Sequence, residues 1–140
     1  MRRNILKLAV IATAVVMASC GGGTPKGIVN DLYSALQKGD YKKAAKIELE
    51  NTWEYAELSK EMRDAFIPLV AEEMREYAEE HYAGGMKSFK ITRAEGDDVV
   101  YGIEMDVTDK SGYGRRNTVI FEKKDGKWWL LEEYNENNWR

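Results

Sequence analysis

The spacing of apolar residues changes once along this chain, at Gly84 and Gly85. Before these glycines, apolar side chains recur with the 3.6-residue period of helices. After them, apolar and polar residues alternate, as in strands that bury one face. The sequence therefore predicts an α+β fold, in which three N-terminal helices pack on a bent four-stranded antiparallel sheet.

The first two predicted helices have clear ends. Thr24 and Pro25 match an N-cap and a first helical position, so a helix begins there. Gly39 ends this helix, and Asp40 caps a second one that covers about residues 41–49. Residues 51–57 fit neither period and stay ambiguous.

A third helix is predicted from Ser59 to Tyr82. Pro68 lies inside it and lacks an N–H group, so we expect a kink or a break near residues 64–67. Seven residues form the apolar face expected to pack on the core: Met62, Phe66, Leu69, Val70, Met74, Tyr77 and Ala78.

The last two strands are predicted to form a hairpin around Asp125 and Gly126. A two-residue turn at this position places Phe121 opposite Leu130. Trp128 then points to the same, core-facing side of the sheet as both. Three apolar residues then share the outer face of the sheet: Ile120, Trp129 and Leu131.

This outer apolar set is large for a monomer, so we predict a homodimer interface there. A binding surface for a different protein is an alternative. A third possibility is that the sheet curls enough to bury both faces. A slip of one residue in the hairpin register would reverse the assignment.

The N-terminus has the features of an export signal. Arg2, Arg3 and Lys7 precede an apolar stretch of 11 residues, 8–18, which is too short to span a membrane. Small residues then lead to Cys20, an arrangement that resembles a bacterial lipobox, although Met17 stands where Leu is commoner.

The predicted organisation is a signal peptide in residues 1–19, a lipidated Cys20 with a glycine-rich tether in 20–24, and one domain in 25–140. Lipid on Cys20 would attach the protein to a membrane. No Asp follows Cys20, and no acidic cluster follows it either. Both features favour the periplasmic side of the outer membrane.

Charge and cysteine content exclude several classes of function. The net charge is −3, and it becomes −6 without the three basic residues at the start of the chain, which argues against nucleic acid as a partner. The chain has one Cys and one His. We therefore predict no disulfide, no metal site and no cofactor.

Three segments resemble the domain of unknown function 4878 family, small envelope lipoproteins of the nuclear transport factor 2-like superfamily. They are residues 36–45 (LQKGDYKKAA), 84–89 (GGMKSF) and 124–128 (KDGKW). The resemblance implies a bent sheet that wraps a long helix around a cone-shaped cavity open at one end. It implies no activity, because this fold hosts enzymes, binders and interaction domains.

Four aromatic residues are candidates to line such a cavity and to receive a small apolar ligand: Tyr33, Trp53, Tyr55 and Tyr101. Filling the core is the alternative role for these rings. His81 is a candidate general base, but a position at a helix C-terminus explains it better. Glu104 and Asp106 share a strand face that we expect to be solvated, as is the glutamate-rich face of the third helix.

We therefore predict no catalytic residues, and a lipid-anchored, non-enzymatic binding or interaction module. A small isomerase- or hydrolase-like enzyme that uses the cone, or a purely structural homodimer, are the alternatives.

Overall fold

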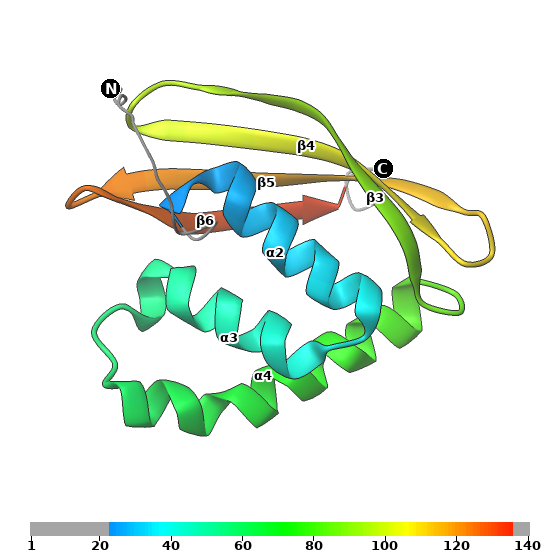
Figure 1. The fold of residues 1–140 in the computed structure, drawn as a ribbon, viewed down its shortest axis with the longest axis horizontal. Helices are drawn as coiled ribbons and strands as arrows, with labels where there is room; N and C mark the ends of the chain where they lie inside the picture. The colour runs from blue at the N-terminus through cyan, green and yellow to red at the C-terminus, as the bar shows by residue number, and fades with distance from the viewer. Residues whose placement is uncertain (1–22, 136–140) are drawn as a thin grey trace.

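The computed structural model of the protein describes residues 23–135. Helices come first in the chain and four strands follow, as Figure 1 shows. The predicted signal peptide and Cys20 lie outside the described residues. Within the described part, no helix is long and apolar enough to cross a membrane.

The first two helices begin and end where the sequence predicts. Helix α2 covers Pro25–Lys38, and the Thr24 hydroxyl accepts a hydrogen bond of 3.1 Å from the Gly27 N–H. Helix α3 covers Tyr41–Asn51 and is capped by the Asp40 carboxylate. Gly39 joins the two helices at a φ of 74°, a left-handed conformation that glycine adopts without strain.

A short 3-10 helix, η3, covers Trp53–Tyr55, within the stretch that the sequence left ambiguous. Helix α4 then covers Lys60–His81, and Ser59 caps it. Helix α4 continues through Pro68, which excludes the break expected near residues 64–67, while the kink expected there stays a prediction. The carbonyl that Pro68 leaves without a partner belongs to Asp64, which is exposed, so water can satisfy it.

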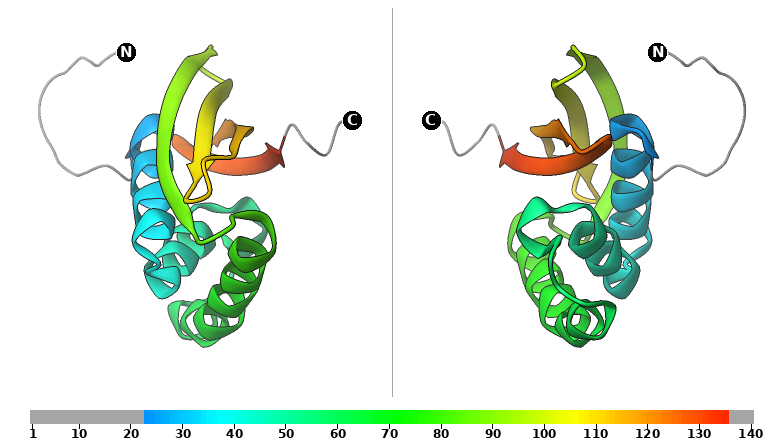
Figure 2. Two further views of the ribbon diagram at one scale, coloured as in Figure 1. Left: turned by 90° about the vertical axis from the view of Figure 1, so that its right-hand side faces the viewer. Right: turned by 90° about the vertical axis from the view of Figure 1, so that its left-hand side faces the viewer.

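The predicted apolar face of α4 is largely exposed, which corrects the sequence interpretation. Leu69 is 62% exposed and Met62 is 51% exposed, and Phe66 and Tyr77 are also exposed. Helices α2 and α3 lie between α4 and most of the sheet (Figures 1 and 2). Helix α4 therefore packs on α3, and its two fully buried residues are the small Ala71 and Ala78.

Four antiparallel strands form one sheet in the order β3-β4-β5-β6. Their bounds are Met86–Gly96, Val100–Asp109, Gly114–Lys124 and Lys127–Asn135. Each strand pairs with the next in the chain, so every connection is a hairpin. Thr52 adds an isolated parallel bridge to Leu130 at the free edge of β6.

The last hairpin has the predicted register. Phe121 pairs with Leu130 across it, and both side chains are buried. Asp125 and Gly126 form the turn with φ values of 54° and 76°, as a two-residue type I′ turn requires. Beyond Leu130 the register shifts, because Ile120 pairs with Glu132. Leu131 is therefore the extra residue of a β-bulge.

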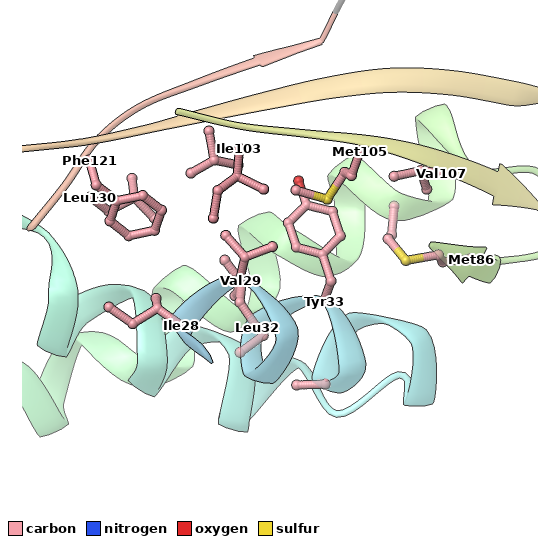
Figure 3. Packing of buried hydrophobic residues seen from close by; sticks show 14 of the residues in the cluster. Ile28, Val29, Leu32, Tyr33, Met86, Ile103, Met105, Val107, Phe121 and Leu130 are labelled. Carbon is pink, nitrogen blue, oxygen red and sulfur yellow. The ribbon is translucent and has the colours of Figure 1, made fainter. Parts of the chain in front are cut away.

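The core lies between α2 and the helix-covered face of the sheet. Figure 3 shows Ile28, Val29 and Leu32 of α2 pointing toward this face. Alternate residues of β4 and β5 meet them, as the period-two pattern predicts. The largest fully buried side chains are Tyr33, Phe121, Ile28, Leu32, Leu49, Ile103, Met105, Val29, Val107 and Val119.

Candidate functional site

A polar cluster interrupts this apolar face around Asn117 of β5. Asn117 is 4% exposed, and its amide Nδ2 donates to the Tyr33 hydroxyl at 3.0 Å and to the Tyr82 hydroxyl at 3.3 Å. Tyr33 comes from α2, and Tyr82 follows the last residue of α4. One amide group thus joins two helical segments to the sheet. We call Tyr33, Tyr82, Asn117 and Arg115 the Asn117 cluster.

Two buried polar atoms of this cluster have no hydrogen-bond partner. They are Oδ1 of Asn117 and Nε of Arg115. Because the two residues are two positions apart on β5, their side chains leave the same face of the sheet. An unsatisfied buried polar atom costs about 1–3 kcal/mol, so a pair of them calls for an explanation.

The guanidinium of Arg115 lies between two tyrosine rings. Its central carbon is 5.8 Å from the ring centre of Tyr82 and 5.3 Å from that of Tyr113. Among residues 23–131, whose side chains the structure describes, no carboxylate forms an ion pair with Arg115. Contacts with ring faces leave the in-plane N–H groups of a guanidinium available, and these groups suit a carboxylate or a phosphate.

Asp109 joins the two segments that carry the tyrosines near this guanidinium. Its buried carboxylate accepts hydrogen bonds from the Ser111 hydroxyl and from the N–H groups of Ser111, Tyr113 and Ala83. These bonds, led by that of the Ser111 hydroxyl, lower the pKa of Asp109 below its usual range. The β4–β5 loop is thus fastened to the end of α4, where Tyr82 lies.

The four aromatic residues predicted to line a cavity have different partners. Tyr33 is buried, and its ring centre lies 5.7 Å from that of Phe89. Tyr101 meets Trp128 at 6.0 Å, and Trp53 meets Trp129 at 5.3 Å.

Tyr55, the fourth of these residues, is half-buried. Burial and the nearby Glu54 raise its pKa. Of the four, only Tyr33 belongs to the Asn117 cluster.

The predicted interface residues are less exposed than the sequence suggested. Trp129 is half-buried, because its ring packs edge-on against Trp53 and its Nε1 donates to the Lys124 carbonyl at 3.3 Å. Ile120 is half-buried as well, whereas Leu131 is 47% exposed. An interface there remains a prediction.

His81 is placed at the end of α4. Its Nδ1 lies 3.0 Å from the Tyr77 carbonyl oxygen, and its ring stacks on Tyr77 at 4.0 Å. The nearest carboxylate, that of Glu80, is 3.7 Å away and exposed.

The carboxylates that the sequence singled out lie on the other face of the sheet or on the helix surface. Asp106 is exposed and contacts Arg116. On α4, Glu72 and Glu79 both pair with Arg75. Among the described residues, no three of the types His, Cys, Asp and Glu are grouped as a metal site requires.

Sequence reasoning missed Asn117, Arg115 and Tyr82. A signal was present, because Arg115 and Asn117 continue the inward phase of Val119 and Phe121 back along β5. Polar residues at positions predicted to face a core indicate either a special structural role or a binding site. The contact between Asn117 and Tyr82 could not be predicted from the alternation along β5, because it depends on where α4 ends.

Three helices on one face of an open antiparallel sheet define the nuclear transport factor 2-like α+β cone fold. The chain belongs to the family called Domain of unknown function (DUF4878), whose model matches residues 18–131. No curated protein sequence matches the chain significantly.

Two solved structures share the fold. One is a protein of Campylobacter jejuni described as an NTF2-like transpeptidase, with 21% identity and a TM-score of 0.53 over 78% of this chain and 98% of that one. The other is a SEC-C motif containing protein of Rhodopseudomonas palustris, with 15% identity and a TM-score of 0.55. The match covers 83% of this chain and 80% of that one. At such identities the likeness concerns the fold alone.

Proposed function

We propose that the protein is a lipid-anchored, non-enzymatic binding module of the cell envelope whose ligand contacts the Asn117 cluster. The observation that carries the binding role is the pair of buried atoms without partners, Asn117 Oδ1 and Arg115 Nε. A ligand that donates a hydrogen bond to the first and accepts one from the second would satisfy both. The function is therefore the binding of a small molecule with both polar and apolar parts.

The chemistry of the two atoms narrows the ligand. An amide oxygen accepts, so it needs an N–H or O–H donor. A guanidinium N–H needs an acceptor, and a carboxylate or phosphate oxygen forms the strongest bond with it. Met105 and Val107, the β4 partners of Asn117 and Arg115, are both buried, so the surroundings of the two atoms are apolar. An amphipathic acid fits this arrangement.

The non-enzymatic part of the proposal rests on the placement of the acid–base groups. His81 Nδ1 meets a backbone carbonyl, and the carboxylate beside it, that of Glu80, is exposed and 3.7 Å away, so no buried carboxylate of the described residues stabilises the imidazolium that a general base forms. Asp106 lies on the face opposite the Asn117 cluster. An isomerase or hydrolase would show turnover that disappears in His81→Ala, and a substrate panel tests this alternative.

The anchor and the location rest on the sequence. Cys20 follows a short apolar stretch and small residues, and no Asp follows it, which supports lipidation and the periplasmic side of the outer membrane. Cells labelled with a clickable fatty acid should show label on the wild type and none on Cys20→Ser. An exported wild type without label would refute the anchor and leave the ligand site untouched.

The ligand site is tested by native purification. The full-length protein is extracted from membranes, and the small molecules that co-purify are identified by mass spectrometry. Arg115→Gln should lose them. Arg116→Gln is the matched control, because Arg116 is its neighbour on β5, points to the opposite face and contacts Asp106. Equal recovery from both variants would contradict the proposed site.

A further inference from the structure

The turn end of the last hairpin carries a cluster of tryptophan rings and lysine ammonium groups. Nζ of Lys127 lies 4.1 Å from the ring centre of Trp129, and Nζ of Lys124 lies 4.3 Å from that of Trp53. The rings of Trp53 and Trp129 pack edge-on. Trp53 is nevertheless 39% exposed. We call Trp53, Lys124, Lys127 and Trp129 the tryptophan–lysine cluster.

Further side chains of the same chemistry border this cluster. On the other face of the hairpin, Nζ of Lys123 lies 5.6 Å from the ring centre of Trp128. The Lys123 N–H donates to the Val99 carbonyl at 2.8 Å, which brings the β3–β4 turn alongside. Val99 is 54% exposed and Val100 is 44% exposed. This end of the molecule thus combines exposed apolar groups, indole rings and ammonium groups.

The cluster lies at the end of the molecule where α2 begins. Figure 1 shows the start of α2, the β5–β6 turn and the β3–β4 turn at one end of the fold. Figure 3 agrees, because Ile28 of the first turn of α2 lies next to Phe121 and Leu130. Five residues, 20–24, join Cys20 to α2, and they span at most about 17 Å when fully extended. A lipid on Cys20 would therefore keep this end close to the bilayer.

We propose that the tryptophan–lysine cluster docks on the surface of the lipid bilayer. This inference rests on the proposed lipid anchor. Tryptophan rings favour the boundary between headgroups and acyl chains, because one edge is polar and the rest is apolar. Lysine stems lie along apolar surface while their ammonium groups reach phosphate, so the lysines that cover the rings here suit the same boundary.

The charges at this end show which force dominates. Glu122 contacts Lys124 at 3.4 Å, and Asp125 occupies the turn. Asp97 lies in the neighbouring turn, where its carboxylate accepts the N–H groups of Val99 and Val100. These acids offset part of the lysine charge. Docking therefore depends on indole insertion and on the anchor, with attraction to anionic lipid as a smaller contribution.

Docking in this way would fix the orientation of the domain. The β4–β5 loop and the end of α4 lie at the opposite end of the fold (Figure 1). Two residues of the Asn117 cluster lie next to these segments, because Arg115 is the second residue of β5 and Tyr82 directly follows α4. The ligand site would then face away from the bilayer.

The experiment uses the full-length lipidated protein in vesicles of phosphatidylethanolamine and phosphatidylglycerol that contain brominated phospholipid, which quenches nearby indoles. A Trp139→Phe background leaves three tryptophans, all at the hairpin end: Trp53, Trp128 and Trp129. We expect their fluorescence to be quenched in brominated vesicles relative to unbrominated ones. Fatty-acid labelling of the same sample reports lipidation independently.

A charge reversal tests the cluster itself. Lys124→Glu with Lys127→Glu should lower the quenching, because the two new carboxylates repel anionic lipid beside the indole rings. Lys42→Glu with Lys43→Glu is the matched control, because these two exposed lysines lie in the first turn of α3. The single variant Lys124→Gln, which leaves the Lys127 bond to the Glu50 carbonyl intact, should lose part of the quenching if the double variant does not fold.

Each remaining outcome overturns the inference in a recognisable way. Labelled protein without quenching would show that the anchor is present and the docking is wrong. Protein without label would refute the proposed anchor and the docking with it. If label is present, quenching is absent and sedimentation shows a dimer that Trp53→Glu dissociates, a second copy occupies the cluster instead of the bilayer.

Discussion

The two ends of the sheet both use aromatic rings and cations, but in different ways. At the hairpin end, indole rings pack on one another and lysine ammonium groups lie over them, near the surface. At the other end, tyrosine hydroxyls meet a buried amide, and an arginine lies between two rings. At the first end, Lys127 and Trp129 donate to backbone carbonyls, and the neighbouring Thr52 Oγ1 is buried without a partner. At the second end, an acceptor, Asn117 Oδ1, and a donor, Arg115 Nε, are both buried without a partner. An unpartnered donor and an unpartnered acceptor two positions apart on one strand therefore distinguish the proposed ligand site from the proposed docking surface.

The apolar core that joins the two ends should carry most of the stability. Phe121 is fully buried, and Phe121→Ala should lower the free energy of unfolding by about 3–5 kcal/mol. Phe66→Ala, on the exposed face of α4, is the matched control and should have a much smaller effect. Urea denaturation measures both. If the first variant unfolded in two separate transitions, the two ends would be independent units and the comparison would fail.

The turns at the two ends should respond differently to the same substitution. A Cβ added at Gly96 would lie 2.2 Å from the Val100 carbonyl oxygen and 2.6 Å from the Tyr101 Cα, so the backbone must move. Gly96→Ala should destabilise by about 1–3 kcal/mol. Gly112 has open space around it, but its φ of 93° strains any other residue, and Gly112→Ala should cost about 1 kcal/mol. Thermal unfolding compares the stability of the two variants. A larger loss in Gly112→Ala than in Gly96→Ala would contradict the close approach at Gly96.

Asp109 should make the ligand end sensitive to acid. Its folded pKa is lowered, so the carboxylate contributes stability above its ordinary pKa of about 3.9, and this stability is lost as the pH falls through the lower folded value. Asp109→Asn should be less stable than the wild type at pH 7, and the difference should shrink in acid. Denaturation curves at several pH values check this, and a difference independent of pH would show that the charge is unimportant.

The smallest expected change in stability is at Asn117. Asn117→Leu removes two hydrogen bonds to tyrosine hydroxyls but also removes the buried oxygen without a partner, so the free energy of unfolding should change by about 1 kcal/mol or less. Ligand recovery should nevertheless be lost. A loss of stability well above this value would identify the amide as a structural fastening rather than a ligand contact.

Local signals in the sequence predicted the fold well. Thr24, Gly39, Asp40 and Ser59 mark helix ends because capping depends on residues only a few positions apart. The hairpin register followed from the alternation around the turn. The break expected at Pro68 does not occur, since the cost of a proline depends on whether water reaches the carbonyl that it leaves without a partner.

The exposure of the α4 side chains and the contacts of the candidate site depend on packing between segments that are distant in the sequence. The apolar side chains of α4 were assigned to the core, but α2 and α3 already cover the sheet, so Leu69 and Met62 are exposed. The candidate site needed contacts between residues 33, 82 and 117 of the chain, and no periodicity reports such contacts. Tyr33 was identified as a candidate from its aromatic character, but its hydroxyl partner was not.

The bridge between Thr52 and Leu130 affects how readily the sheet edges of two molecules can pair. A sheet edge with free N–H and C=O groups recruits the edges of other molecules, and proteins held together on one surface meet often. Thr52 occupies the β6 edge at Leu130. At the opposite edge the Gln37 side chain donates to the Lys87 carbonyl at 2.8 Å, and β3 pairs irregularly in two places. The protein's own segments thus cover part of each edge, and under the proposed lipid anchor these contacts would hinder neighbouring copies from pairing edge to edge.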